Sequence, residues 1–222
     1  DHLNLDEAIS TDDLVQKIYS LNADPDVHGI LVQFPLPRHI DSPLVVRSID
    51  PDKDVDGFTA YNLGKMFLDK NFEQLVPCTP RGIIALLEEY KIDVTGKEAV
   101  VLGASNIVGK PLAAMLVNRR ATVTVCHSKT IDLALHTRRA DLLFVAVGKP
   151  NLITADMVNE GVVVIDVGIN RAKDGKLCGD VDFENVSKKA SFITPVPGGV
   201  GPMTVACLME NVLRAAKKQK KI

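Results

Sequence analysis

The fold is decided by one stretch, Ala99-Val-Val-Leu-Gly103-Ala-Ser105-Asn-Ile-Val-Gly109-Lys-Pro111. Its first four residues form an uninterrupted apolar run, which is typical of a strand covered on both faces of a sheet. Gly103 permits a sharp turn, and Gly109 lets the helix that follows pack closely. The stretch therefore predicts a strand, a tight loop and a helix.

This loop is a relaxed form of the pattern G-x-G-x-x-G, because Ser105 stands at the second glycine. Its backbone N–H groups and the positive end of the helix are suited to binding a phosphate. A strand-to-helix turn that binds no ligand gives the same pattern, so the loop alone leaves both interpretations open.

Three further apolar runs, 122–126, 141–147 and 162–167, alternate with helical stretches. Such alternation predicts an α/β fold with a doubly wound, Rossmann-like parallel sheet and right-handed crossovers. The runs end in small or polar residues, and ligands of open α/β sheets bind beyond the carboxyl ends of the strands. The sequence therefore places a binding edge at these strand ends.

The first third of the chain predicts a helix capped by Thr11 and a buried strand over 29–34. Gln33 lies near the end of that strand, where it either faces a ligand or bonds to neighbouring backbone. Asp54 and Asp56 flank a valine before a glycine, which suits either a binding loop or a solvated turn. Their spacing does not fit a calcium loop.

Prolines around Cys78 mark a predicted domain boundary, after which Thr79 is expected to cap a helix beginning at Pro80. Residues 171–179 predict an exposed turn or hairpin. The proline- and glycine-rich stretch 192–202 predicts a fixed, exposed backbone for contact with a flat ligand. An apolar helix is expected over 204–216, followed by a lysine-rich end.

Composition excludes several function classes. The 222 residues carry a net charge of −2, which gives no electrostatic footprint for nucleic acid or an anionic membrane. No apolar run approaches the roughly 20 residues that span a bilayer. The four cysteines lie far apart in sequence, which favours free thiols in a reducing cytosol over a disulfide and indicates no metal site. The polar start at Asp1 suggests a fragment or a processed chain.

The end of the second predicted sheet strand indicates which dinucleotide binds. An acidic residue there would hold the ribose 2′-hydroxyl of NAD. The chain instead has His127, Ser128 and Lys129. A hydroxyl and a cation favour a 2′-phosphate, so we expect NADP rather than NAD, although Lys129 could simply be solvated.

These segments together resemble the bifunctional methylenetetrahydrofolate dehydrogenase/cyclohydrolase family of the bacterial FolD type. The matching segments run in the family's order: 29–37, 51–57, 77–82, 103–111, 127–130, 166–170 and 193–204. The resemblance implies two α/β lobes with a cleft between them. Residues 1–78 plus 203–222 would form the folate-binding catalytic domain, and residues 79–202 the NADP-binding Rossmann domain.

The resemblance also implies an activity and its residues. The expected enzyme oxidises 5,10-methylenetetrahydrofolate with NADP and hydrolyses the methenyl product to 10-formyltetrahydrofolate. It would serve one-carbon metabolism and purine biosynthesis in the cytoplasm as a homodimer. Gln33 and Asp56 would be catalytic. Substrate would contact Val32, Gln33, Phe34, Asp56, Pro197, Gly198, Gly199, Val200 and Gly201, and cofactor would contact Gly103, Ala104, Ser105, Ser128 and Ile169.

One feature of the family has no counterpart at the expected place. The family's tyrosine that stacks on the pterin and its catalytic lysine form a Tyr-x-x-x-Lys motif near the start of its proteins. Tyr61 and Lys65 have that spacing but lie in another family segment. We therefore expect the N-terminal segment to be missing from this sequence. A non-catalytic nucleotide-binding fragment, or another NADP-dependent oxidoreductase, is the alternative.

Overall fold

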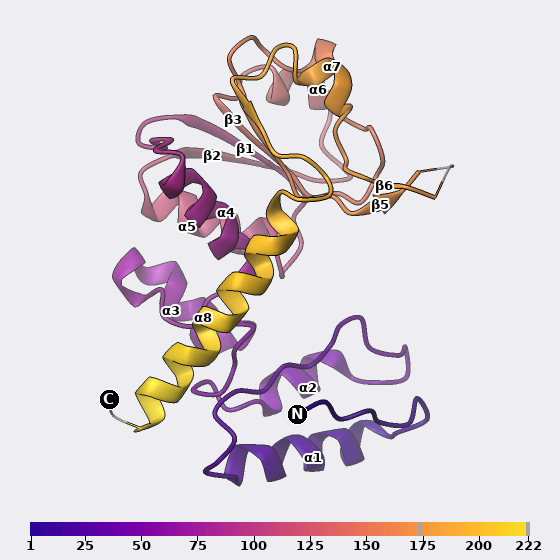
Figure 1. Ribbon diagram of the computed structural model, residues 1–222, viewed down its shortest axis with the longest axis vertical. Coiled ribbons are helices and arrows are strands. Elements are labelled where there is room, and N and C mark those ends of the chain that lie inside the picture. The colour runs from indigo at the N-terminus through magenta and orange to yellow at the C-terminus, as the bar shows by residue number, and fades with distance from the viewer. Residues whose placement is uncertain (173–174, 221–222) are drawn as a thin grey trace.

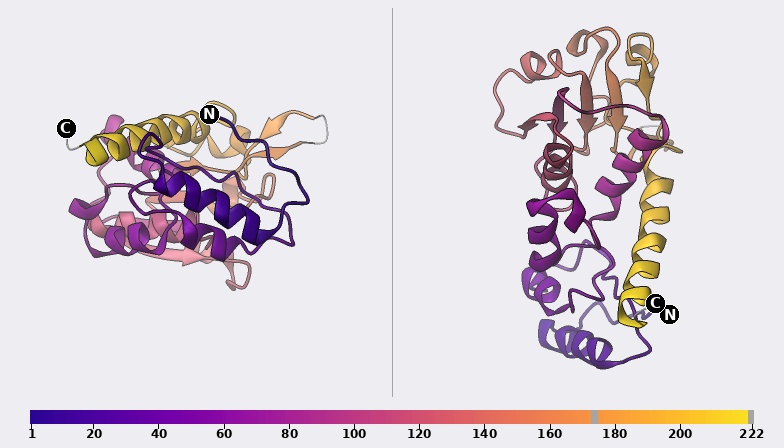
Figure 2. Two further views of the ribbon diagram at one scale, coloured as in Figure 1. Left: turned by 90° about the horizontal axis from the view of Figure 1, so that it is seen from below. Right: turned by 90° about the vertical axis from the view of Figure 1, so that its left-hand side faces the viewer.

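The long helix α8, Val200–Lys220, runs along the molecule from the lobe that holds the sheet to the lobe that holds α1 (Figures 1 and 2). The computed structural model describes residues 1–172 and 175–220. Because α8 packs on both lobes, it sets how they stand relative to each other.

Five parallel strands form the main sheet, in the order β2-β1-β3-β4-β7. Their bounds are Glu98–Leu102 for β1, Thr122–Cys126 for β2, Leu142–Val145 for β3, Val163–Asp166 for β4 and Phe192–Ile193 for β7. The strand order reverses between β1 and β3, which creates the switch point where ligands bind in such folds. The predicted parallel sheet is confirmed.

Both faces of this sheet are buried, which explains the continuous apolar runs. Ala99 and Val101 of β1 pack into one hydrophobic cluster, whereas Val100 and Leu102 pack into another on the opposite face. Helices α4 (Cys78–Glu89) and α5 (Gly109–Asn118) cover the first face. Helices α6 (Leu133–Thr137) and α7 (Phe183–Val186), with the short 3-10 turn η2 (Ala155–Met157), cover the second. The sheet is therefore doubly wound.

A short antiparallel hairpin projects from the carboxyl edge of the sheet. It consists of β5, Asn170–Arg171, and β6, Leu177–Cys178. The predicted turn or hairpin over 171–179 is confirmed for the described residues, and 173–174 lie outside them.

The other lobe contains α1 (Thr11–Ala23), α2 (Ser42–Ser48), α3 (Ala60–Leu68) and the 3-10 turn η1 (Lys70–Phe72). The cap of α1 is Ser10 rather than the predicted Thr11, because the Ser10 hydroxyl accepts the N–H of Asp13 at 3.1 Å. At the other end of α1, the buried ammonium of Lys53 donates to the carbonyl oxygens of Leu21, Asn22 and Asp24. A cation suits that end of a helix.

The predicted strand over 29–34 is wrong. Ile30 makes a single bridge to Asp54, and no other residue of this segment pairs with a strand among the described residues. A strand requires a neighbour that pairs with its N–H and C=O groups along its length, and apolar side chains alone do not supply one. Leu31 is accordingly 43% exposed rather than buried.

Two further helix starts differ from the prediction. Helix α4 begins at Cys78, so Thr79 lies within its first turn and caps nothing; its hydroxyl instead shares a hydrogen bond with that of Thr204 at 3.0 Å. Helix α8 begins at Val200 rather than 204, so it includes part of the proline- and glycine-rich stretch. The last two residues of the predicted lysine-rich end, 221 and 222, lie outside the described residues.

The four cysteines are free thiols, as predicted. No helix among residues 1–172 and 175–220 is long and apolar enough to cross a membrane.

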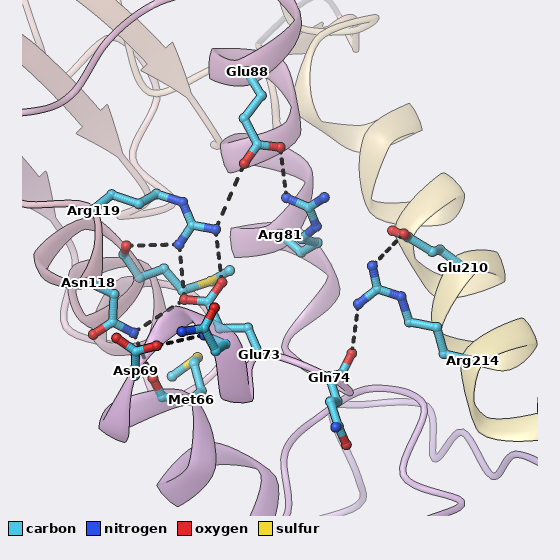
Figure 3. Close-up of polar contacts among 12 residues, drawn as sticks. Met66, Asp69, Glu73, Gln74, Arg81, Glu88, Asn118, Arg119, Glu210 and Arg214 are labelled. Carbon is cyan, nitrogen blue, oxygen red and sulfur yellow. Dashed lines mark hydrogen bonds and ion pairs between the residues drawn. The ribbon is translucent and has the colours of Figure 1, made fainter. Parts of the chain in front are cut away.

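An ion-pair network holds η1 and the residues after it against α4 and α5 (Figure 3). Arg119 pairs with Glu73 through two hydrogen bonds of 2.9 Å, and the Glu73 side chain is only 5% exposed. Asn118 donates to the carbonyl of Met66 at 2.8 Å. Bidentate, desolvated pairs of this kind are the strong class of ion pair. The segment over 69–76 is therefore a rigid joint between the lobes.

We expect Glu73→Gln to lower the free energy of unfolding by about 2 kcal/mol, because Arg119 would keep its charge in a site that excludes water. Urea denaturation followed by circular dichroism measures this change. The control is Glu210→Gln, which breaks the exposed pair with Arg214 and should cost at most about 0.5 kcal/mol. Equal losses in the two variants would contradict the role given to Glu73.

Candidate functional site

The loop between β1 and α5 is fixed by contact between two glycines. A Cβ at Gly109 would overlap the carbonyl oxygen of Gly103, and a Cβ at Gly103 would overlap that of Ala146. Gly103 also has a φ of 112°, which disfavours other residues. The backbone of the loop therefore lies against the start of α5 and the end of β3, as the sequence predicted.

Ser105 has a different task from the glycine it replaces in the pattern. Its hydroxyl accepts the N–H groups of Val108 at 3.1 Å and Gly109 at 3.3 Å, so it satisfies donors at the start of α5. The N–H groups of Ser105, Asn106 and Ile107 have no acceptor in the described part of the chain. Unpaired N–H groups beside a helix N-terminus fit a phosphate.

The remaining predicted cofactor residues lie at the same edge of the sheet. Ala104 follows β1, Ser128 follows β2 and Ile169 follows β4. The turn at Ser128 is held by a hydrogen bond from the His127 N–H to the Thr130 hydroxyl at 2.9 Å. Ile169 is 68% exposed although it is apolar, so it is available to a ligand.

Two buried carboxylates behind this edge escaped the sequence analysis. Asp166 ends β4, and its carboxylate accepts the N–H groups of Gly168, Asp180 and Val181. Burial raises the pKa of Asp166, and these N–H groups oppose that change. Asp180 is also fully buried. The glycines next to them carried a signal, because a Cβ at Gly168 or Gly179 would overlap one of these carboxylates.

A largely apolar cavity of about 530 Å³ separates the loop over 103–108, the candidate phosphate loop, from the lobe of α2 and α3. On one side it is lined by Asn106, Ile107 and Lys110. Opposite them lie Phe34 and Phe58, whose rings meet edge to face with centroids 6.4 Å apart. Both rings are close in sequence to predicted site residues. Phe34 directly follows Gln33, and Phe58 lies two residues after Asp56.

Gln33 is exposed, and its amide donates only to the carbonyl of the next residue, Phe34, at 3.2 Å. Val32 and Phe34 are half-buried, and Val32 packs against the core of α1 and α2. The alternative, in which neighbouring backbone satisfies the Gln33 side chain, therefore explains the amide NH₂ group but not the amide oxygen. The carbonyl oxygen of that amide has no donor among residues 1–172 and 175–220 and is available to another partner.

The two aspartates of the 54–58 loop differ in environment. Asp54 is buried, and its carboxylate accepts the N–H groups of Gly57, Phe58 and Thr59 and the amide of Asn62. It therefore shapes the loop and is not a solvated turn residue.

The carboxylate of Asp56 accepts no such bonds from the residues that the structure describes. Burial, with a smaller contribution from the charge of Asp54, raises its pKa from 3.8 to about 6. Burial, followed by the charge of Asp56, likewise raises the pKa of the Cys78 thiol to about 12. A partly buried carboxylate without donors of its own suits a ligand that brings them.

Helix α8 holds the loop of Asp56 from behind. Asn211 is buried, and its amide donates to the carbonyls of Val55 at 2.8 Å and Val76 at 2.9 Å. The sequence carried a signal for this residue, because Asn211 is the polar exception in the apolar stripe that includes Leu208 and Ala215.

Predicted substrate residues 197–201 are not brought into the same cavity. Gly198 and Gly199 line a separate, smaller cavity of about 170 Å³ with Tyr90 and Phe192. Val200 is buried at the start of α8. The structure thus groups the phosphate loop with the rings beside Gln33 and Asp56, whereas the proline- and glycine-rich segment keeps its assignment only as a prediction.

Tyr61 and Lys65 lie on α3, where the ammonium of Lys65 donates to Gln74 at 3.0 Å and lies 5.4 Å from the Tyr61 ring centroid. Neither lines the large cavity. Among the described residues, no three histidine, cysteine or acidic side chains are placed to hold a metal ion.

The family models match both parts of the chain. Residues 1–56 match the catalytic domain of tetrahydrofolate dehydrogenase/cyclohydrolase, and residues 77–220 match its NAD(P)-binding domain. The chain belongs to the tetrahydrofolate dehydrogenase/cyclohydrolase family. This confirms the predicted resemblance and excludes an oxidoreductase of another family. The second match also includes α8, which the sequence analysis assigned to the folate-binding lobe.

Similar proteins share this assignment. The bifunctional protein FolD of Nautilia profundicola is 58% identical over 95% of this chain and 74% of its own length. The crystal structure of the FolD enzyme of Campylobacter jejuni, also 58% identical, matches with a TM-score of 0.94 over 96% of this chain and 76% of its own. The Trypanosoma brucei family enzyme, solved with NADP and an inhibitor, is 38% identical over 97% of this chain and 75% of its own, with a TM-score of 0.92. The chain thus spans about three quarters of the length of these relatives.

The raised pKa of Asp56 predicts how stability depends on pH. The folded chain holds the proton of Asp56 more tightly than the unfolded chain, so this group makes the fold less stable as pH rises from about 4 to about 6. Asp56→Asn removes this effect. Relative to the unmodified chain, the variant should gain roughly 2 kcal/mol in unfolding free energy across that range and no more above it.

Urea denaturation at pH values from 4 to 8 measures this difference. The control is Asp26→Asn, which makes the same substitution at an exposed aspartate outside the loop of Asp56. Parallel profiles for the Asp56 variant and the unmodified chain would show that Asp56 titrates normally.

Proposed function

We propose that this chain oxidises 5,10-methylenetetrahydrofolate to 5,10-methenyltetrahydrofolate with NADP, and hydrolyses that product to 10-formyltetrahydrofolate. Membership of the family supports the reaction pair. The observation that carries the proposal in this chain is the cavity of about 530 Å³, because its walls come from the phosphate loop and from the rings beside Gln33 and Asp56. A dinucleotide at the loop and a folate beside the rings would share this cavity.

The carboxyl edge of the sheet fits a dinucleotide. Gly103 and Gly109 keep the backbone close, and the unpaired N–H groups of Ser105, Asn106 and Ile107 supply donors for a phosphate. Ser128 and the nearby Lys129 are exposed, which supports NADP over NAD through a hydroxyl and a cation beside the 2′-phosphate. When bound, NADP supplies the acceptor for the hydride that leaves the folate.

The main task of the protein in the oxidation step is alignment. The folate nitrogens themselves provide the electrons that expel the hydride, so the site gains most by holding the one-carbon bridge against the nicotinamide. Asp56 accepts hydrogen bonds from the amino edge of the pterin, for which its carboxylate has free acceptors. The assignment of the 197–201 backbone as a wall along the folate rests on the family alone, since Gly198 and Gly199 line a separate cavity in this structure.

The hydrolysis step requires proton transfer as water adds to the methenyl carbon. In the family the lysine of the Tyr-x-x-x-Lys motif is the cation of this step. Gln33 orients that lysine through the free oxygen of its amide. Both Gln33 and Asp56 are thus assigned to the folate side, with Val32 and Phe34 as further substrate contacts.

The organisation of the chain follows from these roles. We assign residues 1–78 with 203–222 to folate binding and 79–202 to NADP binding. The second half of α8 supports this division, because Ala215 packs with Val55 and Leu75, and Gln219 donates to the carbonyls of His28 and Asp52. We further propose that the protein is a cytoplasmic homodimer that serves one-carbon metabolism and purine synthesis. Sedimentation measures the mass of the assembly and so tests the homodimer.

We expect Asp56→Ala to weaken the binding of a tetrahydrofolate derivative at least about tenfold and to change NADP binding less than twofold. The loss reflects hydrogen bonds to a charged acceptor, which are worth about 1.5–3 kcal/mol. Isothermal titration with each ligand separately measures both affinities. Asp26→Ala serves as the control, and unchanged folate affinity in the Asp56 variant would reject the assignment.

We expect Gln33→Ala to lower the hydrolysis rate at least about tenfold while the oxidation rate falls less than threefold, because only hydrolysis depends on a tuned proton donor. The two steps are assayed separately in a form that carries the family's Tyr-x-x-x-Lys motif. Gln16→Ala, on the exposed face of α1, is the matched control. Equal losses in both steps would refute a role that is specific to hydrolysis.

A further inference from the structure

The carboxylate of Asp180 lies behind the edge of the sheet at which NADP is proposed to bind. Asp180 is fully buried and receives four hydrogen bonds. Its Oδ2 accepts the N–H groups of Val147 at 2.7 Å and Gly148 at 3.0 Å. Its Oδ1 accepts the N–H of Lys149 at 2.7 Å and the amide Nδ2 of Asn170 at 2.8 Å. Both oxygens are therefore fully engaged.

Three of these donors lie in the loop after β3, and the fourth, Asn170, is the first residue of β5, at the end of the loop after β4. Strands β3 and β4 are neighbours in the sheet, with Val145 paired to Asp166 at their ends. Beyond that pair the ladder stops, and the carboxylate of Asp180 bridges the two loops in its place. It therefore fixes the distance between them.

Both loops adjoin residues that the proposed function assigns to the cofactor. The first starts at Ala146, whose carbonyl oxygen lies so close to Gly103 that no Cβ would fit there. The second contains Ile169, which is exposed and immediately precedes Asn170. A line of direct contacts thus runs from the phosphate loop through the loop after β3 and Asp180 to Ile169.

Asp180 has no freedom to follow a movement of either loop. Its own N–H donates to the carboxylate of Asp166 at 3.0 Å, and its carbonyl accepts the N–H of Ile153 at 3.1 Å. Its side chain also leaves no space for a Cβ at Gly168. Because the carboxylate is held from behind, it acts as a rigid support rather than as a flexible link.

We propose that Asp180 is a positioning residue for the dinucleotide, whose carboxylate holds the loops after β3 and β4 in the one arrangement that presents Ile169 and the 146–149 backbone to NADP together. This inference rests on the proposed function for the location of NADP. It predicts that loss of the support weakens cofactor binding and leaves folate binding intact, since no hydrogen bond of Asp180 reaches the other lobe.

Three variants test this role. Asp180→Asn replaces one acceptor oxygen by a donor, so two hydrogen bonds are lost and donors face each other. Asn170→Ala releases only the loop of Ile169 and leaves Asp180 its three N–H partners, so it should fold even if the first variant does not. Asp141→Asn is the matched control, because the carboxylate of Asp141 accepts the N–H of Glu98 at the opposite edge of the sheet.

Titration calorimetry with NADP and with a tetrahydrofolate derivative, together with thermal unfolding, gives the readouts. We expect the Kd for NADP to rise at least about tenfold in Asp180→Asn and about threefold to tenfold in Asn170→Ala, with the folate Kd and the control within twofold. In the oxidation assay the KM for NADP rises while kcat at saturating NADP stays within threefold. A merely structural defect would lower the amount of active protein, and hence kcat, without raising KM.

A double variant separates action through Asp180 from direct contact by Asn170. If Asn170 acts through Asp180, adding Asn170→Ala to Asp180→Asn weakens NADP binding by less than twofold more. An unchanged NADP Kd in folded Asn170→Ala, or a full additional loss in the double variant, would overturn the inference. Failure of the unmodified chain to bind NADP would instead overturn the proposed function, so the two outcomes are distinguishable.

Discussion

The structure depends on one close backbone contact at the end of β1. The carbonyl of Gly103 lies where a side chain of Gly109 would be, and the carbonyl of Ala146 lies where a side chain of Gly103 would be. This contact draws the start of α5 and the end of β3 against the same loop. The N–H groups of Ser105, Asn106 and Ile107 in that loop have no acceptor in the described part of the chain, which suits a phosphate site.

The second requirement is that the folate side meets this loop at a fixed distance. Two joints supply it. Asn211 on α8 holds the backbone at Val55, next to Asp56, and at Val76, and the buried pair of Glu73 and Arg119 holds the segment after α3 against α5. Since neither joint contacts the proposed ligands, both act on the site only through the geometry of the lobes.

The local sequence pattern was sufficient to predict a structural feature where that feature depends on neighbouring residues or on a simple period along the chain. The parallel sheet, the glycine loop and the free cysteines were predicted because they follow from apolar runs, turn residues and sequence spacing. The strand over 29–34 was not, because a strand is defined by its neighbours, and Asp54 alone pairs with that segment. The capping role given to Thr79 failed because its hydroxyl finds a partner 125 residues away at Thr204.

The sequence by itself determined the fold class, the phosphate loop and the family, because these are recorded in motifs and periods along the chain. Only the tertiary structure decided which polar residues support the site and which face it. Asp54 and Asp56 are alike in sequence. Yet the carboxylate of Asp54 accepts backbone N–H groups, whereas burial raises the pKa of Asp56 to about 6. Asp180 gains its place from donors ten and thirty-two residues away. Burial and hydrogen-bond partners are properties of the folded arrangement, so no local pattern specifies them.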